Sequence, residues 1–162
     1  MTEQLSPLAL QALAVVKESG AIIGANHAHP HTIRHKGRID LVTETDIAVE
    51  AFLKERLATL TPEAGFLAEE SAEDLSLPDT CWIIDPVDGT TNFAHGLPLT
   101  VTSVAYRLNG EIVLGIVNAP LLRECFIAEK GKGAWRNGES ISVSSVTACE
   151  NALVATGFPY EI

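Results

Sequence analysis

The chain has 162 residues, a net charge of −10 and a pI of about 4.8, with 46% hydrophobic and 20% charged residues. This composition is typical of a folded globular domain, and its acidic charge repels nucleic acid and anionic lipid, so we expect neither as a partner. The cysteines Cys81, Cys125 and Cys149 are odd in number and form no metal-ligand spacing. With no signal peptide and no uncharged apolar stretch of about 18 residues, the sequence predicts a cytoplasmic protein without a membrane span.

Two helices are predicted in the first 62 residues. The first begins at Ser6-Pro7, an N-cap residue followed by proline at the first helical position, and extends to about Gly24. A loop rich in histidine follows, and a second helix is predicted from about residue 43 to residue 61. The positions expected on the core faces are Leu8, Leu13, Val16 and Ile23 in the first helix and Ile47, Ala51, Phe52 and Leu57 in the second.

The rest of the chain has the pattern of an antiparallel sheet. A buried strand at residues 82–84 is predicted to end in a turn at Asp85-Pro86. Strands at 101–108 and 112–117 flank Asn109-Gly110, a strong hairpin signal, and a strand at 125–128 precedes the glycine-rich turn 131–133 and the turn at 137–138. Helices followed by such a meander indicate an α+β fold.

Residues 152–155 are as apolar as a core strand, but the rest of the chain offers no neighbouring strands for them. We therefore expect a chain shorter than its fold requires. Residues 1–147 would form an N-terminal α+β half that binds metal and phosphate, and residues 148–162 would begin an incomplete C-terminal half.

Acidic residues stand at three places where strands or loops give way to turns: Asp46, Glu69-Glu70, and the segment 85–91. In that segment Asp85 and Asp88 flank the carbonyl of Val87, and oxygen-only ligands of this kind suit Mg²⁺. The next three residues could present free backbone amides to a phosphate. Several carboxylates this close cannot all ionise without cations, so the pattern predicts metal-assisted phosphoryl transfer.

The segment 85–96, Asp-Pro-Val-Asp-Gly-Thr-Thr-Asn-Phe-Ala-His-Gly, closely resembles the signature of the inositol monophosphatase family. Segments 40–46 and 67–71 resemble two further family motifs in the right order, and Lys36-Gly37 resembles the bacterial pattern. Ala68 replaces the usual glycine, and the family's later Trp-Asp motif, which supplies another metal-binding aspartate, would lie beyond Ile162.

The resemblance implies a layered α-β-α-β-α sugar-phosphatase sandwich, of which this chain would carry the first two helices and the N-terminal antiparallel sheet. It also implies a metal site in which Glu69, Asp85 and the Val87 carbonyl hold one Mg²⁺, while Asp85 and Asp88 hold a second.

The catalytic roles implied by the resemblance fall on neighbouring residues. Glu69 and Thr90 would position and activate the attacking water, with Asp46 hydrogen-bonded to Thr90. The phosphate would be bound by the backbone amides of Gly89, Thr90 and Thr91, and Lys36 would lie near the metal cluster.

The family resemblance further implies a lithium-sensitive, Mg²⁺-dependent phosphatase, with a homodimer expected, that acts on a small phosphorylated polyol. An inositol monophosphate is the first candidate, since residues 91–93 resemble the inositol branch. Three alternatives stay open. The chain could be a catalytically incomplete remnant that serves as a binding or dimerisation module, or a phosphatase for another small sugar or nucleotide phosphate. A zinc-binding protein built on His27, His29, His31 and His35 is the third.

Simpler structural interpretations apply to several of these residues. Thr43 and Asp46 match a helix capping box, and this role is compatible with a hydrogen bond from Asp46 to Thr90. The segment 130–133 is predicted to be a hairpin turn rather than a phosphate loop. Cys125 is expected in the core rather than as a nucleophile.

Overall fold

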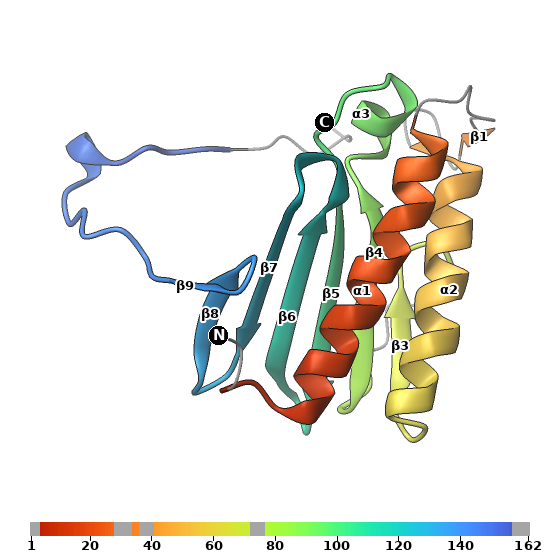
Figure 1. Cartoon of the computed structure of the whole chain (residues 1–162), viewed down its shortest axis with the longest axis horizontal. Coiled ribbons are helices and arrows are strands. Elements are labelled where there is room, and N and C mark those ends of the chain that lie inside the picture. The colour runs from red at the N-terminus through yellow and green to blue at the C-terminus, as the bar shows by residue number, and fades with distance from the viewer. Residues whose placement is uncertain (1–3, 28–33, 36–40, 72–76, 157–162) are drawn as a thin grey trace.

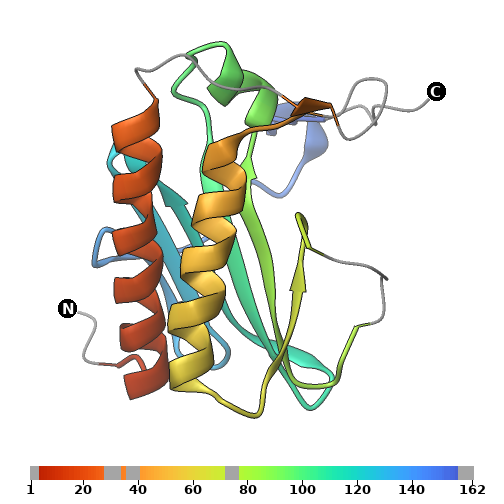
Figure 2. The ribbon, with the colours of Figure 1, turned by 90° about the vertical axis from the view of Figure 1, so that its right-hand side faces the viewer.

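The computed structural model describes residues 4–27, 34–35, 41–71 and 77–156, and it places two long helices on one face of a seven-stranded sheet (Figures 1 and 2). The helices are α1 (Pro7–Asn26), α2 (Glu44–Leu60) and the short α3 (Thr90–Ala94). The strands are β1 (Arg34–His35), β2 (Leu41–Val42), β3 (Gly65–Ala68), β4 (Cys81–Asp88), β5 (Val101–Leu108), β6 (Glu111–Ala119), β7 (Glu124–Glu129), β8 (Gly133–Arg136) and β9 (Glu139–Ile141).

The large sheet has the strand order β3-β4-β5-β6-β7-β8-β9, and β1 pairs with β2 in a separate ribbon. Only β3 and β4 are parallel within the large sheet; the other neighbours are antiparallel. Asn109 and Gly110 join β5 to β6 with φ angles of 52° and 85°, the left-handed pair that a tight hairpin needs. The predicted α+β class and the hairpins at 109–110, 131–133 and 137–138 are confirmed.

Helix α1 begins where the sequence predicts, because the Ser6 hydroxyl accepts a hydrogen bond from the amide of Ala9 at 3.2 Å. By length and composition it is the one helix in the described part of the chain that could cross a membrane. It instead packs on the sheet and on α2, as a core helix does. Leu8 and Leu13 are only half-buried, and the fully buried positions are Ala9, Ala12, Val15, Val16, Ser19, Gly20 and Ile23.

Helix α2 begins with the predicted capping box, in which Thr43 caps the helix and the Asp46 side chain reaches back to the amide of Thr43 at 3.0 Å. Its predicted core face is wrong in part. Ile47 is 49% exposed and Ala51 is also exposed. The buried positions are Thr45, Asp46, Val49, Glu50, Leu53 and Leu57. Two of these are acidic residues, and a hydrophobicity pattern assigns acidic residues to the solvent face.

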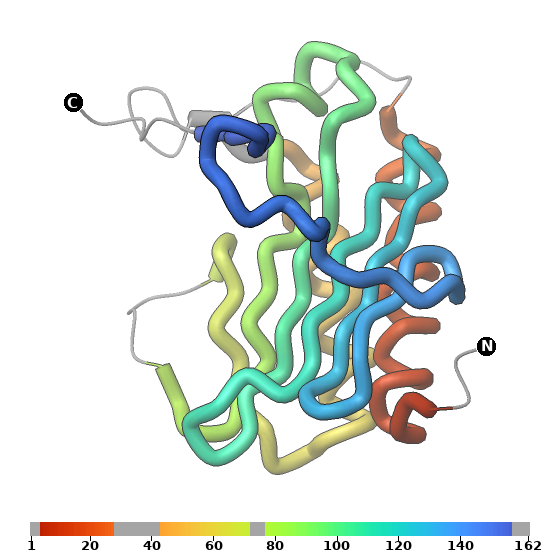
Figure 3. The backbone as a smooth tube through the Cα atoms, turned by 90° about the vertical axis from the view of Figure 1, so that its left-hand side faces the viewer, coloured from red at the N-terminus to blue at the C-terminus, as the bar shows by residue number. Residues whose placement is uncertain are grey.

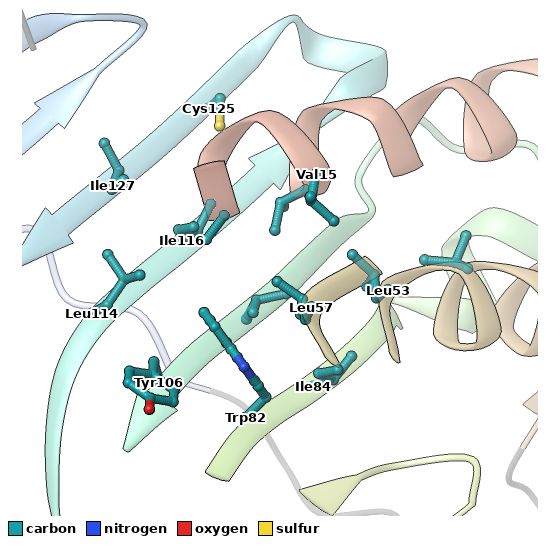
Figure 4. Packing of buried hydrophobic residues seen from close by; sticks show 14 of the residues in the cluster. Val15, Leu53, Leu57, Trp82, Ile84, Tyr106, Leu114, Ile116, Cys125 and Ile127 are labelled. Atoms are coloured by element: carbon teal, nitrogen blue, oxygen red, sulfur yellow. The ribbon is translucent and has the colours of Figure 1, made fainter. Parts of the chain in front are cut away.

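The core lies between the two helices and the sheet, with Trp82 at its base (Figure 4). Trp82 stacks on Tyr106 of the neighbouring strand at a ring-centroid distance of 4.5 Å, and its indole N–H donates to the Thr61 hydroxyl at 2.8 Å. The ring therefore buries its area without leaving its polar atom unsatisfied. Cys125 is buried in the same core, as predicted.

The face of the sheet opposite α1 and α2 is not covered by any of the three α-helices (Figure 3). Beyond β9, residues 142–156 contain one short 3₁₀ turn, Cys149–Asn151; the chain leaves the sheet before this turn and runs back toward it afterwards (Figure 1). The predicted core strand at 152–155 is wrong: these residues form no strand, and Leu153 is fully exposed. A strand needs a hydrogen-bonded neighbour, and none of the described segments supplies one here.

The corrected face of α2 can be tested with two truncations. Leu53→Ala removes a side chain that is 0% exposed and should lower the free energy of unfolding by about 2–5 kcal/mol. Ile47→Ala, six residues earlier on the solvent side, should change it by no more than about 0.5 kcal/mol. Urea denaturation of both variants measures these changes. Equal losses in the free energy of unfolding would instead support the core face predicted from the sequence.

Candidate active site

The acidic residues singled out in the sequence meet at one end of the sheet. Because β3 and β4 run parallel, their carboxyl ends lie at the same edge. The amide of Glu69 continues this pairing by donating to the carbonyl of Ile84 at 3.1 Å, which places Glu69 beside Asp85. Asp46 reaches the same end from the first turn of α2, and α3 lies there as well (Figure 1).

The carboxyl end of β4 is a bulged strand rather than the turn predicted at Asp85-Pro86. Asp85 pairs with Ser103 and Asp88 pairs with Val101, so two residues of β4 oppose one residue of β5. A bulge bends a strand and redirects its side chains. It is held by the buried hydroxyl of Thr102, which donates to the carbonyl of Pro86 at 3.0 Å. The bulge therefore fixes the backbone at Asp85 and Asp88. It also breaks the strict alternation by which successive side chains of a strand point to opposite faces of the sheet.

Gly89 follows directly and turns the chain into α3 with a φ of +91°. A side chain at this position would be strained, and its Cβ would lie 2.8 Å from the carbonyl oxygen of Leu99. The first amides of a helix have no acceptor within the helix. This is the reason to assign the amides of residues 89–91 to a phosphate, and it remains a prediction.

Asp46 ties the start of α2 to the start of α3. One of its oxygens accepts from the amide of Thr43, whose hydroxyl also contacts it, and the other accepts from the Thr90 hydroxyl at 3.0 Å. Thr90 also lies 2.9 Å from the carbonyl of Val87. Asp46 is 1% exposed, so this link lies under the site and not on its surface. The structure thus contains the hydrogen bond between Asp46 and Thr90 that the family resemblance implies.

The pKa of Asp85 is strongly perturbed. Burial raises the pKa of its carboxyl to about 8, with further contributions from Glu69 by charge and hydrogen bond, and from the charges of Asp88 and Asp46. One of its oxygens is buried and has no hydrogen-bond partner. A carboxylate held among other carboxylates with an unsatisfied oxygen is a position that a cation would stabilise.

The donor set suits a hard cation, since the carboxylates of Glu69, Asp85 and Asp88 and the carbonyl of Val87 are all oxygen ligands. As the side chains stand, no three Asp, Glu, His or Cys residues in the described ranges form a group ready to hold a metal ion. Binding would therefore require side-chain adjustment around the orphaned oxygen of Asp85. The residues fit Mg²⁺ by their chemistry, and the ligand set remains a prediction.

Two other predicted features, the lysine near the metals and the histidine-rich zinc site, fall largely outside the described residues. Lys36 lies outside the described residues, as do His29 and His31, so neither the lysine nor the histidine-rich zinc site is placed. His27 is described, and it packs against Phe93 of α3 with ring centroids 5.8 Å apart. Its buried Nδ1 has no hydrogen-bond partner.

Sequence reasoning missed Glu50. This residue of α2 is 4% exposed, and its Oε2 accepts a hydrogen bond from the amide of Glu70 at 2.7 Å. The available signal was its spacing, because Glu50 follows Asp46 by four residues and so shares its helix face.

Comparison with known proteins identifies relatives over nearly the whole chain. The sequence profile of the "Inositol monophosphatase family" matches residues 4–161. An inositol monophosphatase of Dictyostelium discoideum is 46% identical over 154 residues, which cover 93% of this chain and 57% of that relative. A fructose-1,6-bisphosphatase/inositol-1-monophosphatase of Thermotoga maritima is 43% identical, covering 73% of this chain and 45% of the relative. The Nus factor SuhB of Escherichia coli is 33% identical, covering 97% and 60%.

Solved structures share the fold. The extragenic suppressor protein suhB from Bartonella henselae superposes with a TM-score of 0.81 at 32% identity, covering 87% of this chain and 56% of its own. An IMPase/NADP phosphatase complexed with Mg²⁺ and phosphate gives 0.70 at 29% identity, covering 78% and 49%. A LiCl-soaked inhibitory complex of Staphylococcal inositol monophosphatase-1 gives 0.72 at 28%, covering 79% and 49%. The chain spans about half the length of the relatives it matches.

The backbone requirement at Gly89 can be tested by stability. Gly89→Ala should destabilise the protein through both the positive φ and the contact with the Leu99 carbonyl. The matched control is Gly96→Ala, which has a φ of +72° but open space around the added Cβ, so it should lose only the left-handed penalty of about 1–2 kcal/mol. Chemical denaturation should show a clearly larger loss of the free energy of unfolding for Gly89→Ala. Equal losses would show that the contact with the Leu99 carbonyl does not matter for stability.

The raised pKa of Asp85 predicts a pH dependence in the metal-free protein. The carboxyl titrates near pH 8 when folded and near about 4 when unfolded. Between these values the native state holds a proton that the unfolded state has released, so stability falls as pH rises through this window. Asp85→Asn removes that slope. In urea denaturation with EDTA, the free energy of unfolding of the variant should therefore rise relative to that of the wild type from pH 4 to pH 8. Parallel pH dependences of the two proteins would contradict the raised pKa.

Proposed function

The chain belongs to the inositol monophosphatase family, and on that premise we propose that the protein is a Mg²⁺-dependent phosphoric monoester hydrolase. The observation that carries the proposal is the link from Asp46 to Thr90, formed beside the crowded carboxylates of Glu69 and Asp85. The solved relative that holds Mg²⁺ and phosphate supports the choice of cofactor.

In the proposed site, Glu69, Asp85 and the Val87 carbonyl hold one Mg²⁺, and Asp85 with Asp88 holds a second. Bound Mg²⁺ lowers the pKa of a water, neutralises charge on the phosphate and stabilises the leaving oxygen. The chain contributes carboxylates on a backbone fixed by strand pairing, so only their side chains need to adjust when the metal binds.

Thr90 and Glu69 prepare the attacking water. Asp46 uses one oxygen for the Thr43 amide and the other for the Thr90 hydroxyl, so Thr90 donates its proton inward. The lone pairs of Thr90 then face outward, where they can accept a hydrogen bond from the water and orient it. Glu69 takes a proton from that water while the oxygen of the water bonds to phosphorus. The bond between phosphorus and the alcohol oxygen breaks at the same time.

The amides of Gly89, Thr90 and Thr91 hold the phosphate oxygens. This assignment rests on the position of these amides at the start of α3 and on the bare backbone at Gly89, where a Cβ would meet the Leu99 carbonyl. Lys36 is assigned to the neighbourhood of the metals from the family pattern alone.

The proposed substrate class is a small phosphorylated polyol, with inositol monophosphate first. The relative from Dictyostelium discoideum carries this name, whereas that from Thermotoga maritima is also named a fructose-1,6-bisphosphatase. Sugar and nucleotide phosphates therefore stay in the proposal as alternatives. We assign the protein to the cytoplasm, and we expect a homodimer, which light scattering would show as a mass twice that of the protomer.

The deciding experiment measures phosphate release by the protein at its full natural length. Inositol monophosphate, fructose 1,6-bisphosphate and a 2′-phosphorylated nucleotide are supplied in turn, with Mg²⁺ or with EDTA. We expect release only with Mg²⁺, and Asp85→Asn should lower kcat/KM by at least about a hundredfold, since removing one well-placed electrostatic group costs that much. Lithium chloride should inhibit more than potassium chloride at equal ionic strength.

A matched control is Asp79→Asn, which changes an exposed aspartate at the opposite end of β4 and should leave the rate unchanged. Absence of Mg²⁺-dependent release from every substrate would contradict the proposal and favour the catalytically incomplete remnant. Equal effects of the two salts would argue against the lithium-sensitive class.

A further inference from the structure

Three residues of α2, spaced four apart on one face, each contact a loop of the candidate site. Asp46 accepts from Thr90, and Glu50 accepts from the amide of Glu70. Lys54 donates to the hydroxyl of Ser71 at 2.8 Å. The helix therefore touches both the segment after β4 and the segment after β3, and a helix is stiff enough to fix the separation of the two.

Glu50 stands out because it is a carboxylate buried in the protein. Burying a charge is costly unless hydrogen bonds compensate for lost water, so a buried Glu is uncommon without a structural or chemical reason. Its bond to the Glu70 amide is short at 2.7 Å, as expected for a charge-assisted hydrogen bond. A Gln or Met of similar size would fill the space without this cost.

The bond falls where it can determine the position of Glu69. On one side of Glu69, its own amide is anchored to the carbonyl of Ile84 in β4. On the other side, the amide of Glu70 is anchored to Glu50 in α2. The turn closes with the amide of Ser71 donating to the carbonyl of Ala68 at 3.3 Å. Glu69 thus lies between two backbone anchors, one to the sheet and one to Glu50 of α2, while Lys54 of α2 contacts the side chain of Ser71 at the end of the turn.

We propose that Glu50 is a positioning residue that holds the 69–71 turn so that the Glu69 carboxylate faces Asp85. Its role in metal binding and rate rests on the proposed function, but its role in holding the turn does not. Glu50 acts through the backbone of Glu70 and does not itself touch the metal or the substrate.

The test uses the protein at its full natural length and three substitutions. Glu50→Gln keeps an oxygen that can accept from the Glu70 amide, whereas Glu50→Met keeps the volume and removes the acceptor. The matched control is Val49→Ala, which truncates a fully buried neighbour on the same helix and so destabilises α2 without touching the turn. Hydrogen exchange of the Glu70 amide is measured in the metal-free state, Mg²⁺ binding by calorimetry, and phosphate release by steady-state kinetics.

In Glu50→Met we expect exchange of the Glu70 amide to become faster by about tenfold or more, as loss of a charge-assisted hydrogen bond implies. Mg²⁺ affinity and kcat should each fall by roughly 10–100-fold, as for residues that orient metal ligands, with the substrate KM little changed. Glu50→Gln should restore most of the protection, the affinity and the rate. Val49→Ala should lower the melting temperature with none of these losses.

Unchanged Glu70 exchange in Glu50→Met would overturn the proposal, as would Mg²⁺ affinity no lower than in Val49→Ala. Failure of Glu50→Gln to restore protection would also overturn it. A wild-type protein without Mg²⁺-dependent phosphatase activity would instead contradict the proposed function, while exchange and calorimetry would still decide the role of Glu50.

Discussion

Mutual repulsion among carboxylates at one end of the sheet is the constraint on which the site depends. The parallel pairing of β3 and β4 brings Glu69 beside Asp85. Asp88 follows on β4, after the bulge. Burial, followed by the neighbouring charges of Glu69 and Asp88, raises the pKa of Asp85 to about 8. The crowded carboxyl groups destabilise the fold locally, but strand pairing and helix packing still fix the backbone around them. A cation bound in the proposed site would relieve this crowding.

Helix α2 extends that rigidity to Thr90 and to the 69–71 turn. Its core contacts come from Val49, Leu53 and Leu57, and its acidic positions face the site from the same side. Asp46 serves at once as a capping residue and as the acceptor for Thr90. Core contacts and contacts to the candidate site therefore share one helix face, and this explains why a strict apolar stripe is absent from it.

The sequence predicted the elements well wherever local chemistry decides them. The cap at Ser6, the capping box at Thr43 and the hairpin at Asn109 each depend on neighbours a few residues away. The failures depend on distant contacts. The bulge after Asp85 is set by pairing with β5, and the buried place of Glu50 is set by an amide twenty residues further along the chain. The candidate ligands were found from motifs, but their electrostatic coupling became visible only once the strands were placed.

The most direct test of the central claim is a crystal structure of the protein at its full natural length, grown with Mn²⁺ in place of Mg²⁺ and with phosphate. Anomalous scattering would locate the metal without ambiguity. We expect density between the carboxylates of Glu69, Asp85 and Asp88, and phosphate on the amides of residues 89–91. Metal bound instead at the histidine-rich segment, with these carboxylates unoccupied at saturating Mn²⁺, would contradict the account.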